Sequence, residues 1–327
     1  MAKIIKIKAS AGYLPSRVVT NEELAELMPT SDEWIQKHTG IKTRHYALDE
    51  QTSQMASKVA QELLKQAKVN ASEIDLIIVA TISGDAITPA TAALVQEQIQ
   101  AQNAFAFDIS AACAGFIFAL STAEKFLRGV YHKALVICAE SNSKMLDFTD
   151  RTSAVFFGDG AAGVLLESCQ GDLKKDCFKA EMLCTKGNAD VIHSGKIAPL
   201  SEVVATNYPQ TTAFYQDGRS VYEFVTTQVS QHMKDFLAQN NLTAQQIDLF
   251  IVHQANLRLI EQLAKQLNVS LDKFVINVTH AGNTSSVGIP LALSQAWQAQ
   301  KRPAKVMLTG FGAGLAYGSL LLDLSNN

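Results

Sequence analysis

Long apolar runs, an excess of positive charge and paired cysteines are all missing from this sequence of 327 residues. No apolar run approaches the ~18 residues that a membrane-spanning helix needs, and the first residues lack the apolar region and the cleavage site of a signal peptide. The net charge of −3 gives no overall basic field for nucleic acid or for an anionic membrane. We therefore expect a cytoplasmic protein that binds neither nucleic acid nor membranes.

The cysteines are odd in number and form no C-x-x-C pair of the kind found in zinc and redox sites; they are Cys113, Cys138, Cys169, Cys177 and Cys184. In a chain without a secretion signal, this pattern predicts free thiols in a reducing compartment. We therefore expect no metal, and any special cysteine is expected to be catalytic rather than structural.

Apolar runs of strand length alternate with longer stretches of helical periodicity, which predicts α/β layers around a largely buried sheet. The alternation of lysine and isoleucine over the first ten residues indicates a half-buried strand. The remaining expectations for the first half are helices at 90–101 and 113–129 and strands at 71–81, 103–110, 133–140 and 161–168.

The second half repeats this order, with strands expected at 245–253, 273–279, 304–310 and 316–324. Five of six residues match between IDLIIV (74–79) and IDLFIV (247–252), which lie 173 residues apart. The match favours an internal duplication, so we predict two similar α/β halves, 1–170 and 171–327. Polar cap segments around 13–52 and 171–220, the latter made of loops and short strands, are expected to shape a substrate tunnel.

Three polar residues follow predicted strands, and ligands of open α/β sheets bind beyond the carboxyl ends of strands. They are Cys113, His253 and Asn283. Cys113 and Asn283 lie 39 and 36 residues after the first residue of their respective hexapeptides, so a pseudo-twofold would bring both to one cleft. Each has a structural alternative: a small apolar filler for Cys113, a structural histidine for His253, and a turn residue for Asn283, with His280 as its rival.

The neighbours of Cys113 suit a nucleophile. Alanines and a glycine leave access to the sulfur, and the first turn of the predicted helix supplies N–H groups and a positive dipole end that favour thiolate.

Two glycine-rich stretches need separate interpretations. GDGAAG (158–163) matches the dinucleotide fingerprint G-x-G-x-x-G, but a strand-like sequence follows it where that motif requires a helix. We therefore reject a nicotinamide site and expect no cofactor. GFGAG (310–314) also leads into a strand, and its small residues allow main chain to approach a substrate and to offer N–H groups to a carbonyl oxygen, as in an oxyanion hole.

Six segments together resemble β-ketoacyl-acyl carrier protein synthase III, through nearly the whole chain and in that family's order. They are TSDEWIQKHTGIKTRH (30–45), AACAGF (111–116), DRTSAVFFGDGAAGVLL (150–166), HQANLR (253–258), HAGNTSSVGIPLAL (280–293) and GFGAGLAYGS (310–319). The resemblance implies a thiolase-like fold, α/β with five layers (α-β-α-β-α) built from two duplicated halves. It also implies a multifunctional, homodimeric enzyme of fatty acid biosynthesis with acyl-CoA and acyl carrier protein as partners.

The resemblance also assigns roles to the candidate residues. The cysteine matching Cys113 takes an acyl group from acyl-CoA; malonyl-acyl carrier protein then loses CO₂ to give a carbanion that attacks the thioester. The residues matching His253, neutral and donating through Nε2, and Asn283 donate hydrogen bonds to the malonyl thioester carbonyl. The N–H groups of Cys113 and Ala313 form the oxyanion hole, and Phe311 matches an aromatic residue near the decarboxylation site.

The resemblance extends to the binding of the two substrates. Trp34 and Arg151 match the pair that holds the CoA adenine between them. The segment matching the carrier-protein docking site comprises Gln254, Ala255, Asn256, Leu257 and Arg258, of which Arg258 is expected to meet acidic groups.

Two residues depart from the family pattern. His38 stands where many members have an arginine near the CoA phosphates, which predicts weaker CoA binding near neutral pH. Thr88 stands where some members have a phenylalanine that shortens the acyl pocket across the dimer interface, which predicts a pocket for longer or branched primers.

Other functions remain as alternatives. A polyketide starter synthase shares the Cys-His-Asn set. A thiolase is disfavoured because GFGAGLAYG lacks a second cysteine, and a synthase with a Cys-His-His set is disfavoured because Asn283 takes the third position. A nicotinamide oxidoreductase and a catalytically silent binding paralogue are the alternatives outside the condensing enzymes.

Overall fold

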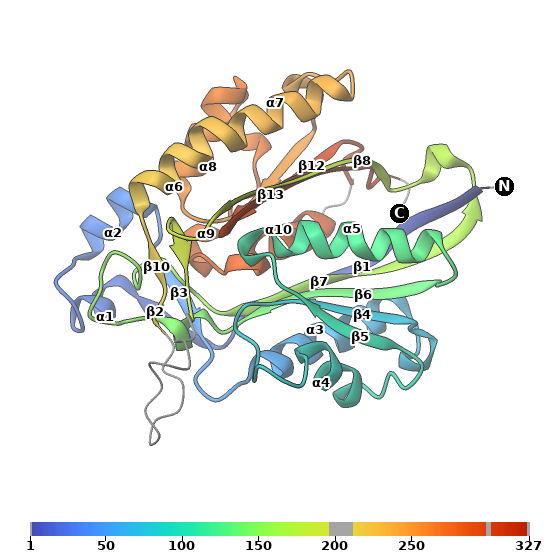
Figure 1. Ribbon diagram of the computed structural model, residues 1–327, viewed down its shortest axis with the longest axis horizontal. Helices are drawn as coiled ribbons and strands as arrows, with labels where there is room; N and C mark the ends of the chain where they lie inside the picture. Colours follow the sequence, from blue (N-terminus) through green and yellow to red (C-terminus); the bar gives the residue numbers. More distant parts are fainter. Residues whose placement is uncertain (1, 196–211, 299–301, 326–327) are drawn as a thin grey trace.

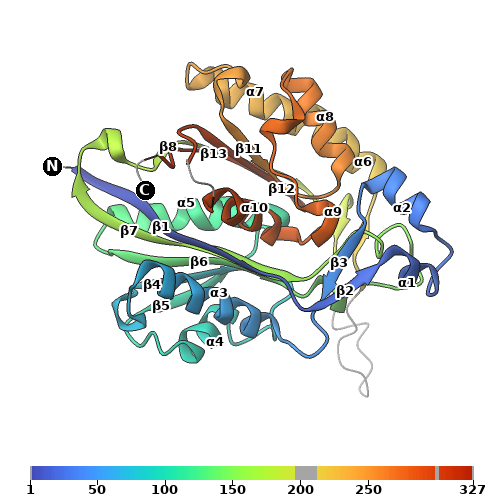
Figure 2. The ribbon, with the colours of Figure 1, turned by 180° about the vertical axis from the view of Figure 1, so that it is seen from behind.

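The computed structural model describes residues 2–195, 212–298 and 302–325. Two stacked β-sheets form the frame, with helices between them and on both outer faces (Figures 1 and 2). Five layers result, which confirms the predicted α-β-α-β-α arrangement.

The first sheet consists of β1 (Ala2–Tyr13), β4 (Leu76–Ala80), β5 (Phe105–Ile109), β6 (Lys133–Glu140) and β7 (Gly160–Gly171). Its strand order is β1-β7-β6-β4-β5. The central strands β6, β4 and β5 are parallel, and β7 is antiparallel to both β6 and β1. All four strands predicted in the first half, and the N-terminal strand, are confirmed.

The second sheet consists of β8 (Phe178–Asn188), β11 (Leu249–Val252), β12 (Val306–Gly312) and β13 (Gly314–Leu322), in the order β11-β12-β13-β8. β8 corrects the prediction of loops and short strands for its part of the chain. Its residues pair with β13 along most of their length, and its side chains alternate between half-buried and exposed, as in an edge strand.

The strand predicted at 273–279 is wrong. Only Phe274 forms a parallel bridge, to Phe250, and α9 (Val278–Ala281) follows. The reason is the side chain of Gln254, whose Oε1 accepts the N–H groups of Asn277 and Val278 at 3.0 and 3.3 Å. These N–H groups are therefore satisfied without a strand partner.

The helices complete the layers (Figures 1 and 2). α5 (Gly115–Arg128) and α10 (Gly288–Trp297) lie between the sheets, α3 (Thr52–Ala67) and α4 (Thr91–Gln98) cover the first sheet, and α7 (Ser230–Gln239) and α8 (Leu257–Leu267) cover the second. The β4 run LIIVA is apolar at every position because its residues alternate between two cores: Leu76, Ile78 and Ala80 lie in the core between the sheets, and Ile77 and Val79 lie in the core under α3.

The cap predicted at 13–52 contains the antiparallel pair β2 (Arg17–Thr20) and β3 (Thr43–Tyr46) and the helices α1 (Asn21–Ala25) and α2 (Asp32–Thr39). A second small pair, β9 (Ile192–His193) and β10 (Tyr215–Gln216), precedes α6 (Gly218–Phe224) and a π-turn at Val225–Val229. The stretch 196–211 of the second predicted cap lies outside the described residues. Short 3₁₀ turns occur at Ala71–Glu73, Asn142–Met145, Leu173–Lys175, Ala244–Gln246 and Leu271–Lys273.

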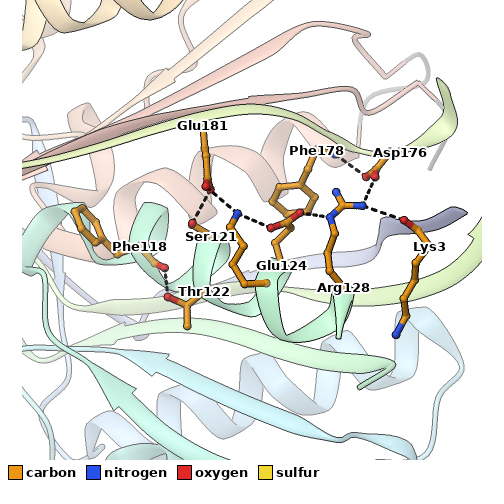
Figure 3. Close-up of polar contacts among 10 residues, drawn as sticks. Lys3, Phe118, Ser121, Thr122, Glu124, Arg128, Asp176, Phe178 and Glu181 are labelled. Atoms are coloured by element: carbon orange, nitrogen blue, oxygen red, sulfur yellow. Dashed lines mark hydrogen bonds and ion pairs between the residues drawn. The ribbon is translucent and has the colours of Figure 1, made fainter. Parts of the chain in front are cut away.

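An ion network fixes the C-terminal half of α5 to both sheets (Figure 3). Arg128 pairs with Glu124 on its own helix and with Asp176 ahead of β8 at 2.7 Å, and it donates to the carbonyl of Lys3 in β1 at 3.0 Å. Glu181 of β8 accepts from Ser121 at 2.6 Å. The helix that begins beside Cys113 is therefore held at its far end.

In the described part of the chain, no helix has the length and apolar character needed to cross a membrane. Within the same residues, no group of three or more histidine, cysteine, aspartate or glutamate side chains is arranged to hold a metal ion.

Candidate active site

Cys113 lies in a one-turn 3₁₀ helix, η2 (Ala112–Ala114), between the end of β5 and the start of α5. The end of β12 passes directly over it. A Cβ atom placed on Gly312 would lie 2.8 Å from the backbone nitrogen of Cys113 and 2.9 Å from its Cβ. Only glycine permits this approach, which brings the β12–β13 turn against the nucleophile candidate.

Ser285 joins the three residues singled out from the sequence. Its Oγ lies 3.5 Å from the Sγ of Cys113, and its backbone N–H donates to the Oδ1 of Asn283 at 2.9 Å. The ring of His253 contacts the backbone of Ser285. The structure therefore brings Cys113, His253 and Asn283 together around one residue. Sequence reasoning missed Ser285, because nothing distinguished it from the other turn residues of HAGNTSS.

His253 follows β11 and is buried, with its backbone N–H bonded to the carbonyl of Thr309 at 2.9 Å. Burial lowers the pKa of His253 to about 3, against a weaker opposing contact with Ser285. This low pKa favours the neutral imidazole at neutral pH, and donation through Nε2 stays a prediction. Its Nδ1 has no hydrogen-bond partner among the described residues, and the edge of its ring packs on Phe311 with a centroid separation of 5.1 Å.

Asn283 is held by its backbone on both sides. Its N–H donates to Phe156 at 2.8 Å, and its carbonyl accepts from Gly158 at 3.0 Å. The stretch GDGAAG thus supports the Asn283 loop and leads into β7, without the helix of a dinucleotide site. Because Ser285 occupies the Oδ1 of Asn283, the Nδ2 amide group is the part free to donate to a substrate. His280, the rival candidate, is exposed on α9.

The electrostatic environment of Cys113 differs from the prediction. Burial raises the pKa of Cys113 to about 12, although its contact with Ser285 acts in the opposite direction. The backbone N–H and Ser285 contacts of Cys113 do favour the thiolate, but desolvation outweighs them in the free enzyme, and α5 begins only at Gly115. The resting thiol is neutral at neutral pH.

A pocket of about 160 Å³ connects Asn283 with the surface near His38 and Arg258. Phe156 and Tyr222 form part of its walls. Of the three candidate residues, Asn283 lines this pocket, and His38 lines it from the side of the 13–52 cap.

Comparison with known proteins decides the family. Models described as 3-oxoacyl-[acyl-carrier-protein (ACP)] synthase III and its C-terminal part match residues 107–185 and 237–324. Beta-ketoacyl-[acyl-carrier-protein] synthase III 1 of Lactiplantibacillus plantarum is 56% identical over 98% of this chain and 99% of its own length. The chain belongs to the β-ketoacyl-acyl carrier protein synthase III family. It is therefore an acyl-transferring condensing enzyme, as predicted.

Other members of the synthase III family agree in sequence and in fold. The synthase III of Streptococcus suis is 45% identical over 98% of both chains. The crystal structure of 3-oxoacyl-[acyl-carrier-protein] synthase III from Aquifex aeolicus VF5 matches with a TM-score of 0.88 and 35% identity, over 98% of this chain and 99% of that one. The predicted thiolase-like fold is confirmed.

The residues that this synthase III was predicted to use for the CoA adenine are in direct contact. The guanidinium carbon of Arg151 lies 4.9 Å from the centre of the Trp34 ring, and the ring of His38 stacks on Trp34 with centroids 4.3 Å apart. A planar base between Trp34 and Arg151 needs roughly 7 Å, twice an ordinary contact distance. Arg151 must therefore move if an adenine is to enter. Thr88 is exposed.

The predicted carrier-protein segment of this synthase III divides into a buried and an exposed part. Gln254 is fully buried, and its Nε2 donates to the carbonyls of Val252 and Val275 at 2.9 and 3.0 Å. The prediction that Gln254 contacts acyl carrier protein is wrong, because a partner cannot reach a fully buried side chain. Ala255, Asn256 and Leu257 are half-buried, and Asn256 caps α8. Arg258 is exposed, with its guanidinium bonded to the carbonyls of Gln36 and Lys37 and to Glu261.

Proposed function

We propose that this chain condenses an acyl-CoA primer with malonyl-acyl carrier protein, through an acyl-Cys113 intermediate, to give the 3-oxoacyl-acyl carrier protein that starts fatty acid synthesis. The observation that carries the proposal is the meeting of Cys113, His253 and Asn283 around Ser285. The identity of 56% to a synthase III over nearly the whole chain supports it.

The first half-reaction transfers the acyl group. The sulfur of Cys113 attacks the thioester carbonyl of acyl-CoA, the bond to the CoA sulfur breaks, and the thiol proton passes to the leaving CoA thiolate. The backbone N–H groups of Cys113 and Ala313 bind the oxyanion, and the close approach of Gly312 supports this pairing. Because the resting thiol is neutral, proton removal accompanies the attack.

The second half-reaction forms the carbon–carbon bond. Malonyl-acyl carrier protein loses CO₂, and His253 and Asn283 donate hydrogen bonds to the enolate oxygen that develops. Each donor contributes roughly 3 kcal/mol. The enolate carbon attacks the acyl-Cys113 thioester, and the released sulfur takes a proton from solvent. Phe311, packed on His253, keeps water from this part of the site.

The binding of substrates and partners completes the proposal. Acyl-CoA enters through the 160 Å³ pocket, which His38 lines; Trp34 stacks on His38, and the adenine displaces Arg151 from Trp34. Acyl carrier protein docks beside Arg258. The enzyme works in the cytoplasm as a homodimer of chains that each contain two duplicated halves (1–170 and 171–327), and Thr88 lines the acyl pocket of the partner subunit. The reaction needs no cofactor and no metal.

One solved structure bears on the polyketide alternative. A priming β-ketosynthase from the R1128 polyketide pathway matches with a TM-score of 0.89 but only 29% identity. The synthase III relatives at 45% to 56% identity favour fatty acid initiation over this alternative.

Mass spectrometry tests the proposal. Wild type and Cys113→Ala are each mixed with acetyl-, butyryl- and isobutyryl-CoA, and malonyl-acyl carrier protein is then added. We expect an acyl adduct only on wild type, followed by its loss and the appearance of 3-oxoacyl-acyl carrier protein. An adduct on Cys113→Ala, or a wild-type adduct that malonyl-acyl carrier protein does not consume, would contradict the proposal.

A further inference from the structure

Glu140 is a fully buried carboxyl group that the reaction described above does not use. It is the last residue of β6, at the carboxyl end of the first sheet. Among the described residues, no lysine, arginine or histidine forms an ion pair with it. Burial of a carboxyl group lowers the stability of the fold unless hydrogen bonds satisfy its oxygens. The partners of Glu140 therefore indicate what the group does.

One oxygen of Glu140 binds the segment that follows β4. Oε2 accepts from the Oγ of Ser83 at 2.5 Å, from the backbone N–H of Ile82 at 3.1 Å and from the Oγ1 of Thr81 at 3.3 Å. These three residues line a cavity of about 640 Å³, and the chain continues from them to Thr88. Thr88, the residue predicted to line the acyl pocket, thus lies five residues beyond this segment in the sequence.

The other oxygen of Glu140 binds the turn that carries the catalytic candidates. Oε1 accepts from the Oγ of Ser286 at 2.7 Å. Ser286 belongs to the 3₁₀ turn η9 (Ser285–Val287), in which Ser285 contacts Cys113 and fixes the amide of Asn283. Ser286 also lies under the start of α5, since a Cβ atom on Gly115 would be only 3.2 Å from it.

We propose that Glu140 is a positioning residue of the condensation, which holds the 81–83 segment and the Ser285–Val287 turn in a fixed relation around Cys113. The 81–83 segment and the turn that carries Ser285 are then both bonded to one buried carboxyl group. The claim for the condensation rests on the proposed function. The claim about geometry rests only on the hydrogen bonds of Glu140.

The charge of Glu140 provides a second readout. Burial raises the pKa of Glu140, and the four donors on its oxygens act in the opposite direction. An ionised Glu140 raises the pKa of Cys113, in η2, and of Cys138, in β6. The 81–83 segment and the Ser285–Val287 turn present only hydroxyl, amide and aliphatic groups to it. A change of Glu140 therefore alters the titration of Cys113, which a loss of stability alone does not do.

Four variants test the proposal: Glu140→Gln, Ser286→Ala, the double variant, and Asp176→Asn as the matched control. Glutamine keeps the size of the side chain, but it removes the charge and replaces one acceptor with a donor. Asp176 is a buried carboxyl group of the network at the far end of α5, about 20 Å from the start of that helix. It controls for the loss of a buried carboxylate in general.

We expect Glu140→Gln and Ser286→Ala each to lower the kcat of condensation about tenfold or more, because a small misplacement of catalytic groups has large effects. The double variant is expected to be no slower than the slower single variant, since both changes break one link. Asp176→Asn is expected to keep a wild-type kcat despite a lower melting temperature. Multiplying effects in the double variant, or an equal loss of kcat in Asp176→Asn, overturns the proposal.

Alkylation of Cys113 by iodoacetamide, followed by mass spectrometry over pH 6 to 10, separates failure of this proposal from failure of the proposed function. Because the thiol of Cys113 is mostly protonated over this pH range, we expect Glu140→Gln to be alkylated faster than wild type at each pH, while Asp176→Asn is alkylated at the wild-type rate. An unchanged alkylation rate in Glu140→Gln overturns the positioning role even in an enzyme that condenses as proposed. A faster rate in a protein that does not condense these substrates supports the role and rejects the proposed function.

Discussion

The contact between Gly312 and Cys113 gives the most direct prediction, through the variant Gly312→Ala. The added methyl group would lie 2.8 Å from the nitrogen, 2.9 Å from the Cβ and 3.2 Å from the Cα of Cys113, against 3.4 Å or more for an ordinary contact. The end of β12 must therefore retreat from η2 by about half an ångström. Overpacking of this kind costs about 1–3 kcal/mol of unfolding free energy.

The same retreat separates the N–H groups of Ala313 and Cys113. Because a misplacement of 1 Å can cost about a hundredfold in rate, we expect acylation of Cys113 to slow roughly tenfold. Urea denaturation and the single-turnover rate of adduct formation from acyl-CoA measure the two effects. Gly187→Ala is the matched control, since a Cβ atom there has no neighbour within 4 Å.

Two results would count against this reasoning. If Gly312→Ala has wild-type stability and acylates normally, the packing of the β12–β13 turn on Cys113 is not as described. If stability falls and the acylation rate stays unchanged, the turn packs as described but does not supply the oxyanion hole.

Three further predictions follow from the same site and its supports. His253→Ala is expected to acquire the acyl group at a near-normal rate but to condense roughly a hundredfold more slowly, measured with pre-acylated enzyme; an equal loss of both steps would reject the division of roles. The pKa of His253 is about 3 in the folded chain and 6.5 in an unfolded one, so between these pH values the unfolded state binds a proton that the folded state does not bind. Unfolding free energy should therefore fall as pH drops from 6.5 towards 3, and His253→Gln should show a shallower slope in denaturation curves. Arg128→Leu leaves the buried carboxylate Asp176 without its ion-pair partner and leaves Glu124 with Lys125 alone, and we expect a loss of about 2 kcal/mol in urea denaturation; a change near zero would show that the network does not hold α5.

Local patterns in the sequence were sufficient for most of the sheet. β6 begins and ends where its apolar run does, and β4 and β11 overlap the two matching hexapeptides. These segments are buried on both faces, so their composition alone identifies them. The edge strand β8 was missed because its lysines and glutamate suit solvent as well as a strand.

The errors at the site have tertiary causes. The backbone after Phe274 leaves the strand because a distant side chain, that of Gln254, satisfies its N–H groups. The same burial removes Gln254 from the docking surface. The thiol of Cys113 titrates high because the layers around it exclude water, which no neighbouring residue in the sequence reveals. Ser285 could not be predicted from the sequence, because its place in the site depends on contacts with three separate segments.

The division of the site between the two sheets has a consequence for how the enzyme fails. Cys113 follows a strand of the first sheet, and His253 follows a strand of the second. Neither layer holds the complete set of proposed catalytic groups by itself, so separation of the two sheets during gradual denaturation is expected to abolish turnover. A measurement of turnover in this protein therefore reports whether the two sheets are still packed together.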